Sequence, residues 1–290
     1  METPFADTHV QRPTTSLLPV RRTVDALSRR TPWIAWLVCL PAIAVAEVLT
    51  AVVDARLGIT IHAVIFLVLL RCGARGTEAE QRLYWALSLA PLLRLLSYGL
   101  PLNRFPLVWW YAIVGALMLM AILLAVRAMD YRPAEVGLGW RWPQLPLHLL
   151  AGGAGLLLGA AQYVLLWPAP LALALSWSHT WLPAVVMVIC SGFVEELLFR
   201  GLMQRAASEA LGAWSGPLLV VAVATALHAG YLSWPALALT LLANALFALL
   251  AARMGTIWGA ALAHGLANVS LYLVAPFVVD RAMFAGWLPQ

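Results

Sequence analysis

The longest uncharged stretch of the chain spans residues 142–194 and reads WPQLPLHLLAGGAGLLLGAAQYVLLWPAPLALALSWSHTWLPAVVMVICSGFV. It contains no Asp, Glu, Lys or Arg, and the same holds for residues 210–252 and 254–279. Because one helix needs about 20 apolar residues to cross a bilayer, the first two stretches are each long enough for two crossings joined by a turn. The sequence therefore predicts an all-α, multipass transmembrane helical bundle.

The overall composition agrees with a protein whose main solvent is lipid. Of the 290 residues, 63% are hydrophobic and only 11% are charged. Since about a quarter of the residues in a soluble domain are charged, this composition excludes a water-soluble enzyme, a disordered tail and a nucleic-acid-binding module. The three cysteines are an odd number without paired spacing, which argues against a disulfide framework and a cysteine-based metal site.

Apolar runs predict about eight to nine spans, with nine candidates at residues 33–53, 57–71, 83–100, 106–126, 146–167, 180–199, 215–231, 234–252 and 256–278. All 18 basic residues are arginines, and they gather in alternate loops if the N-terminus is cytoplasmic. We expect a basic cytoplasmic arm at 1–32, accessory helices at 33–127, a core at 146–278 and a short tail at 279–290.

Three acidic residues, Glu47, Glu195 and Glu196, lie well inside the predicted spans. An ionisable group at the bilayer centre costs about 2.5–3.5 kcal/mol on insertion scales, so each needs a partner, a wet cavity or a function. Glu196 and Arg200 are four residues apart in a helix, in the favourable orientation for an ion pair. Glu195 lies about 100° around the helix axis and is left without a partner from its own helix, which suits a general base.

Two histidines and an asparagine are expected at the same depth as Glu195. If two helices run antiparallel from a turn near Gly212, Glu195 and His228 each lie roughly 24 Å from that turn and can share one water. His264 and Asn268 are four residues apart, on one face of the last span. Both side chains can donate hydrogen bonds where an oxyanion develops.

A second buried polar cluster is predicted in the front half of the chain. Glu47 and His62 are equidistant from a turn near Asp54, and Arg94 lies within the third span. This cluster is either a structural lock between accessory helices or part of a substrate gate or second site.

The motifs resemble those of the CPBP family, the CAAX protease and bacteriocin-processing (ABI) family, which includes the CAAX-prenyl endopeptidases. Its signatures are EExxxR, FxxxH and HxxxN or HxxxD on separate transmembrane helices. They match Glu195 and Glu196 with Arg200, then His228, then His264 with Asn268, over about residues 146–278. One position departs from the pattern, because Ala224 stands where the second signature has Phe.

The resemblance implies a glutamic-type intramembrane endopeptidase of a prokaryotic plasma membrane that cleaves a membrane-associated protein or peptide. Glu195 and His228 would activate water, His264 and Asn268 would stabilise the oxyanion, and Glu196 with Arg200 would support the site. A metal-free reaction is expected, and a zinc-dependent one is the alternative, although the HExxH spacing is absent. The same polar residues would also suit a non-proteolytic membrane scaffold or immunity protein, or a proton-coupled transporter.

Overall fold

The computed structural model describes residues 35–280, and these form helices without any strand. The predicted all-α multispan bundle is confirmed. The predicted arm at 1–32 and residues 281–290 of the predicted tail lie outside the described residues.

The front half consists of four long helices joined by short connections. Their caps explain where two of them begin: the Asp54 side chain accepts from the Arg56 amide, and Thr77 and Glu80 form a reciprocal capping box. The elements are η1 (Ala35–Cys39), α3 (Leu40–Val52), α4 (Ala55–Gly73), α5 (Glu78–Gly99), η2 (Leu102–Arg104) and α6 (Leu107–Ala128).

The second half contains four long helical stretches and one shorter one. Turns at Gly212 and Gly255 have positive φ angles of 94° and 65°, which glycine adopts without a Cβ penalty. The elements are η3 (Trp142–Gln144), α7 (Leu145–Leu166), α8 (Trp177–Val186), η4 (Met187–Phe193), α9 (Val194–Glu196), η5 (Leu197–Met203), α10 (Gln204–Leu211), α11 (Ser215–Ala226), η6 (Ala229–Tyr231), α12 (Trp234–Met254), α13 (Trp258–Val269), η7 (Ser270–Val274) and α14 (Ala275–Val278).

Within residues 35–280, each of the nine predicted spans coincides with helix, and 7 stretches are long and apolar enough to cross a membrane. The predicted span 83–100 falls in α5, which carries Glu80, Arg82 and Arg94 and is less apolar. The predicted span 215–231 is divided between α11 and η6 and is shorter. The 7 stretches are Ala35–Val52, Ala55–Gly73, Leu107–Ala128, Trp142–Leu166, Trp177–Leu211, Trp234–Met254 and Trp258–Val278.

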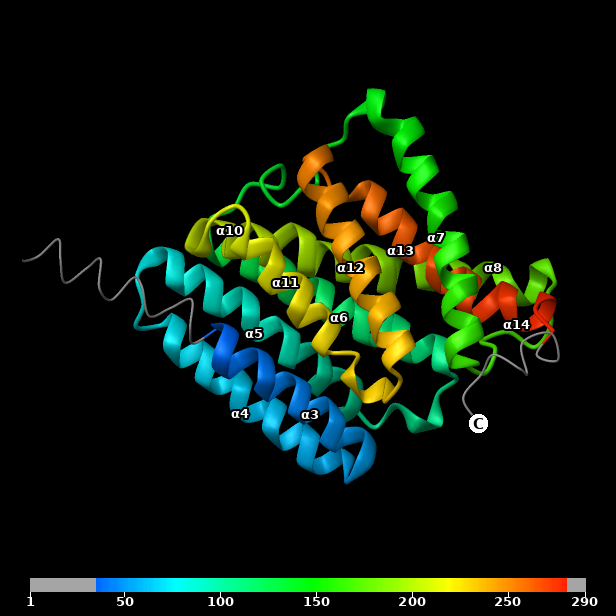
Figure 1. Ribbon diagram of the computed structural model, residues 1–290, viewed down its shortest axis with the longest axis horizontal. Helices are drawn as coiled ribbons and strands as arrows, with labels where there is room; N and C mark the ends of the chain where they lie inside the picture. The colour runs from blue at the N-terminus through cyan, green and yellow to red at the C-terminus, as the bar shows by residue number, and fades with distance from the viewer. Residues whose placement is uncertain (1–34, 281–290) are drawn as a thin grey trace, which may run out of the picture.

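The helices are arranged so that the two halves of the chain meet along α10, α11 and α6. In Figure 1, α3, α4 and α5 lie on one side, and α7, α8, α13 and α14 lie on the other. The small-residue face of α7 packs directly on α13, since a Cβ at Gly155 or Gly159 would lie about 2 Å from the Ala263 or Ala267 carbonyl oxygen. Gly155 and Gly159 form a GxxxG pair, a pattern of small residues that lets two helix backbones approach closely.

Two predicted boundaries need correction. The helix expected at 180–199 continues to Leu211, a stretch of 35 residues. Near its end, Glu209 accepts from Tyr131 and from Arg82 and Arg205, and this polar network explains how charged residues follow an apolar span. His228 does not lie inside a helix as expected but just beyond the carboxyl end of α11, which stops at Ala226.

Candidate active site

The adjacent glutamates lie at an irregular point of the longest helix. Glu195 and Glu196 belong to the 3-residue segment α9, between the π-helical segments η4 and η5. Insertions of π-helix change the angular register of the side chains around a helix axis and are frequent at functional sites. Despite this irregularity, Glu196 still pairs with Arg200 four residues later, as predicted.

Glycines bring the glutamates close to α13. A Cβ at Gly192 would lie 2.5 Å from the Cα and amide nitrogen of Gly265, and a Cβ at Gly265 would lie 2.7 Å from the Cα of Val188. No larger residue fits at either position without moving backbone. This contact sets the spacing between the glutamates and the two polar residues of α13.

Glu196 is completely buried and holds two partners through one oxygen. Its Oε1 lies 3.1 Å from Arg200 Nη1 and 2.8 Å from His264 Nδ1. Because an ionised carboxylate can only accept hydrogen bonds, both nitrogens are the donors. Arg200 Nη2 donates in turn to the Asn244 side-chain oxygen at 2.6 Å, and Asn244 Nδ2 donates to the Thr225 hydroxyl at 3.2 Å. Glu196 and Arg200 therefore join α9 and η5 to α13, α12 and α11.

Glu195 has a more open environment than Glu196. Its side chain is 25% exposed, and its Oε1 accepts from the Ser191 hydroxyl at 3.1 Å. Asn268 Nδ2 donates to the same Ser191 oxygen at 2.8 Å, and His264 Nε2 lies 4.0 Å from Glu195 Oε2. Glu195 thus keeps one oxygen available for a further partner in the cavity.

His228 is oriented by its own helix end. Its Nδ1 donates to the Ala224 carbonyl at 2.8 Å, so in the neutral ring Nε2 is left as an acceptor. Ala224, where the resemblance leads one to expect Phe, is 2% exposed in the apolar core. An aromatic neighbour comes instead from Tyr231, whose ring lies edge-on to His228 with centroids 5.1 Å apart.

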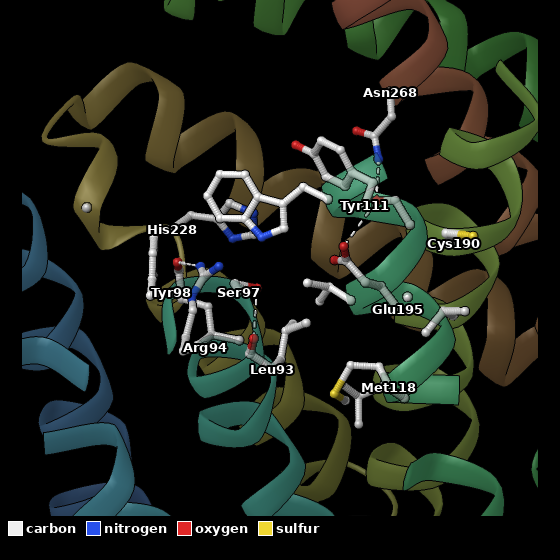
Figure 2. Close-up of a pocket in the computed structure, with 18 of the residues that line it drawn as sticks. Leu93, Arg94, Ser97, Tyr98, Tyr111, Met118, Cys190, Glu195, His228 and Asn268 are labelled. Carbon is white, nitrogen blue, oxygen red and sulfur yellow. Dashed lines mark hydrogen bonds between the residues drawn. The ribbon is translucent and has the colours of Figure 1, made fainter. Parts of the chain in front are cut away.

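The side chains of the candidate site line one cavity of about 560 Å³. The predicted residues Glu195, His228, His264 and Asn268 all line it. Figure 2 shows Glu195 and Asn268 on one side of the cavity, and His228 with Arg94 on the other. Four tyrosines complete the polar part of the wall: Tyr98, Tyr111, Tyr231 and Tyr272.

The second predicted cluster also forms, and it borders the same cavity. Glu47 Oε1 accepts from Arg94 Nε at 2.6 Å and from His62 Nε2 at 3.1 Å. Glu47 and Arg94 contribute to the cavity wall, whereas His62 is fully buried behind them. The sequence predicted this cluster but not that it adjoins the first.

Sequence reasoning did not identify several residues that the fold adds to the site. Ser191 lies four residues before Glu195, so helical spacing could have placed it on the same face. Asn244 stands out only as a polar residue in an apolar run. The sequence did not indicate that the tyrosines line a cavity, because tyrosines are also common at membrane interfaces.

A zinc-dependent site would need several side chains arranged around one ion. Among residues 35–280, no group of three or more His, Cys, Asp or Glu side chains is arranged to hold a metal ion. In the cavity, His264 Nδ1 and His228 Nδ1 are already engaged by Glu196 and by the Ala224 carbonyl. These bonds leave Nε2 of each ring, so zinc is disfavoured because the described residues do not place three donors around one position.

Fold and cavity together define a multipass helical membrane protein with a polar site enclosed among its helices. Residues 177–270 match the family model described as Rce1-like, type II CAAX prenyl endopeptidase Rce1-like. Over this segment, which contains all the motif residues, the match agrees with the predicted resemblance to the CPBP family of proteases. No curated protein and no solved structure gave a match.

Proposed function

We propose that this protein is a glutamic-type intramembrane endopeptidase that hydrolyses a peptide bond in a membrane-associated protein or peptide. The observation that carries the proposal is the contrast between the two adjacent glutamates. Glu196 is buried and bonded to Arg200 and His264, whereas Glu195 faces a cavity lined by His228, His264 and Asn268. An open carboxylate among fixed hydrogen-bonding groups is what water activation requires.

In the proposed reaction, Glu195 and His228 bind a water between them. The water would donate to Glu195 Oε2 and His228 Nε2. The other atom of each side chain is already bonded, Glu195 Oε1 to the Ser191 hydroxyl and His228 Nδ1 to the Ala224 carbonyl. The water oxygen attacks the peptide carbonyl carbon and its proton passes to Glu195. That proton then moves to the amide nitrogen as the C–N bond breaks, so the base is regenerated.

Asn268 and His264 are the proposed oxyanion donors. Asn268 has a second amide hydrogen beyond the one directed at Ser191. His264 donates from Nδ1 to Glu196, so donation from Nε2 requires its second proton, and the carboxylates of Glu195 and Glu196 are the groups placed to stabilise that charge. Loss of one oxyanion donor typically lowers kcat by about 10²–10³-fold.

We propose a metal-free reaction in a prokaryotic plasma membrane with the N-terminus in the cytoplasm. The lack of a three-donor group among residues 35–280 supports the metal-free reaction, and the alternation of arginine-rich loops supports the cytoplasmic N-terminus. The family description names prenyl endopeptidases, so farnesylated peptides are the first probes to examine, beside unmodified membrane-anchored peptides.

The test uses the purified protein in liposomes with quenched fluorescent peptides of both kinds. We expect cleavage that resists EDTA and that falls by about 10²–10⁴-fold in Glu195→Gln and His228→Ala. Full activity of Glu195→Gln contradicts the mechanism, and loss with EDTA followed by rescue with Zn²⁺ favours the zinc-dependent reaction. Biological activity that survives alanine at both Glu195 and His264 favours a scaffold. Proteins that co-purify with Glu195→Gln are candidate substrates.

A further inference from the structure

The carboxyl end of α11 is held from outside its own helix. α11 stops at Ala226, two residues before His228. The last carbonyl groups of a helix have no partner within it and must be satisfied by other groups. The Leu227 carbonyl, directly before His228, accepts from the guanidinium of Arg94 in α5. A cation at this end of a helix is also favoured by the helix dipole.

Arg94 is itself fixed by two buried residues of the accessory helices. Its Nε donates to Glu47 of α3, which also accepts from His62 of α4. Glu47 is 3% exposed and His62 is fully buried, so the guanidinium has little freedom to move. A second contact lies beside it, because a Cβ at Gly230 of η6 would come within 3.2 Å of the Glu47 carbonyl oxygen.

We propose that Arg94 is a positioning residue for His228, and that the Glu47–His62–Arg94 cluster is the device by which α3, α4 and α5 complete the site. This inference rests on the proposed function, in which His228 orients the attacking water. The three helices lie outside the matched segment 177–270. The segment that carries the motifs therefore depends on the front half of the chain to place one of its own histidines.

A second network, through Thr225, Asn244 and Arg200, reaches His228 from another side. The Thr225 carbonyl accepts from the His228 amide at 2.9 Å, and the Thr225 hydroxyl accepts from Asn244, which is bonded to Arg200. The loop around His228 is thus held between two arginines, one from each half of the chain. Displacement of a catalytic group by about 1 Å can cost about 10²-fold in rate, so this restraint is significant for the reaction.

Removal of Arg94 alone would leave Glu47 buried without its cation and could prevent folding. The test therefore pairs the substitutions Glu47→Gln and Arg94→Met, which removes both charges at nearly constant volume. Arg94→Lys keeps the charge beside Glu47 while it loses the reach of the guanidinium fork. Arg71→Met serves as the control, because Arg71 is exposed in the last turn of α4 and remote from the cavity.

Two measurements are needed, and one of them is independent of activity. ¹⁵N-histidine NMR in lipid, with the His228 signals assigned by His228→Gln, reports the ring environment. Kinetics with the quenched peptides report kcat and KM separately. An inactive wild type would reject the proposed function, while the His228 signals would still test the positioning role.

We expect the folded double variant to shift or broaden the His228 ring signals and to lose about 10²-fold in kcat with little change in KM. Arg94→Lys should give intermediate values of both, and Arg71→Met should match the wild type. His228 signals that coincide with the wild type in the folded double variant would overturn the proposal. A change in KM alone would also overturn it, because Arg94 would then contact the substrate directly. If the double variant does not fold, the His228 NMR signals and the kinetics of Arg94→Lys test the proposal, with the same outcomes for and against it.

Discussion

Each half of this molecule contains a triad in which a buried Glu accepts from an Arg and a His. In the front half, Glu47 Oε1 accepts from Arg94 and His62. In the matched segment, Glu196 Oε1 accepts from Arg200 and His264. A buried ion pair with a histidine is therefore not what distinguishes the candidate active site.

The difference lies in what stands next to each triad. Glu196 is preceded by Glu195, a second carboxylate that is 25% exposed in the cavity. Glu47 has no carboxylate beside it in the sequence, where its neighbours are Ala46 and Val48, and its arginine reaches instead to the backbone before His228. The comparison teaches that a carboxylate with two bonded partners holds helices together, while a carboxylate with an unused oxygen remains able to bind a further group.

The largest effect on stability is expected from Glu196→Gln. It leaves the Arg200 charge, whose side chain is 1% exposed, without its carboxylate, and breaking a buried pair in this way costs about 3–5 kcal/mol. Glu47→Gln should cost less, since Arg94 is 18% exposed toward the cavity and keeps its bond to Leu227. Denaturant unfolding in detergent measures the free energy of unfolding of both variants. Equal decreases in the two variants would contradict the distinction between the triads.

A change at Gly265 tests whether close backbone contact places the second triad. In Gly265→Ala, the new methyl group meets the Cα of Val188, and such overpacking typically costs about 1–3 kcal/mol. We also expect peptide cleavage to fall, because α13 carries His264 and Asn268. Gly153→Ala in α7 is the matched control: its Cβ meets nothing within 4 Å, and it should gain about 0.5–1 kcal/mol. Unchanged stability and activity in Gly265→Ala would show that this contact can relax.

Asn244→Ala tests the connection from the second triad to the helix end before His228. The variant removes the Oδ1 acceptor of Arg200 and the Nδ2 donor to Thr225, but it leaves the Asn244 backbone carbonyl, which also accepts from that guanidinium. The loss of one charged hydrogen bond should cost about 1.5 kcal/mol. Thermal unfolding gives the stability, and the His228 NMR signals should move as well. An Asn244→Ala protein with unmoved His228 signals would leave Arg94 as the main restraint.

The smallest effect is expected where the two halves meet away from both triads. Tyr131 donates to Glu209 at 2.5 Å, and burial together with this bond raises the pKa of Tyr131 above its ordinary value. Its stabilising contribution is therefore present below about pH 10 and is lost as the pH rises further. Tyr131→Phe should cost about 0.5 kcal/mol below that pH and leave peptide cleavage unchanged. Loss of cleavage in this variant would show that the outer network also controls the site.

Much of the site could be predicted because charges are rare in this chain. The spacing of Glu196 with Arg200 and of His264 with Asn268 places each pair on one helix face, whatever the rest of the fold does. The turns near Gly212 and Arg253 were also predictable from glycine and from the end of the apolar pattern, and α10 and α12 end there. Helical period and the cost of charges in lipid are local properties, and the sequence determines them directly.

Tertiary structure alone decided which atoms meet across helices. It placed His264 in a hydrogen bond with Glu196 and close to Glu195. It also placed Ser191 between Glu195 and Asn268, with a hydrogen bond to each. It also placed Arg94 of the front half against the helix end before His228. These contacts depend on interhelical distances and rotations, which no helical period contains. Between η4 and α13, the backbone contact at Gly192 and Gly265 sets the distance.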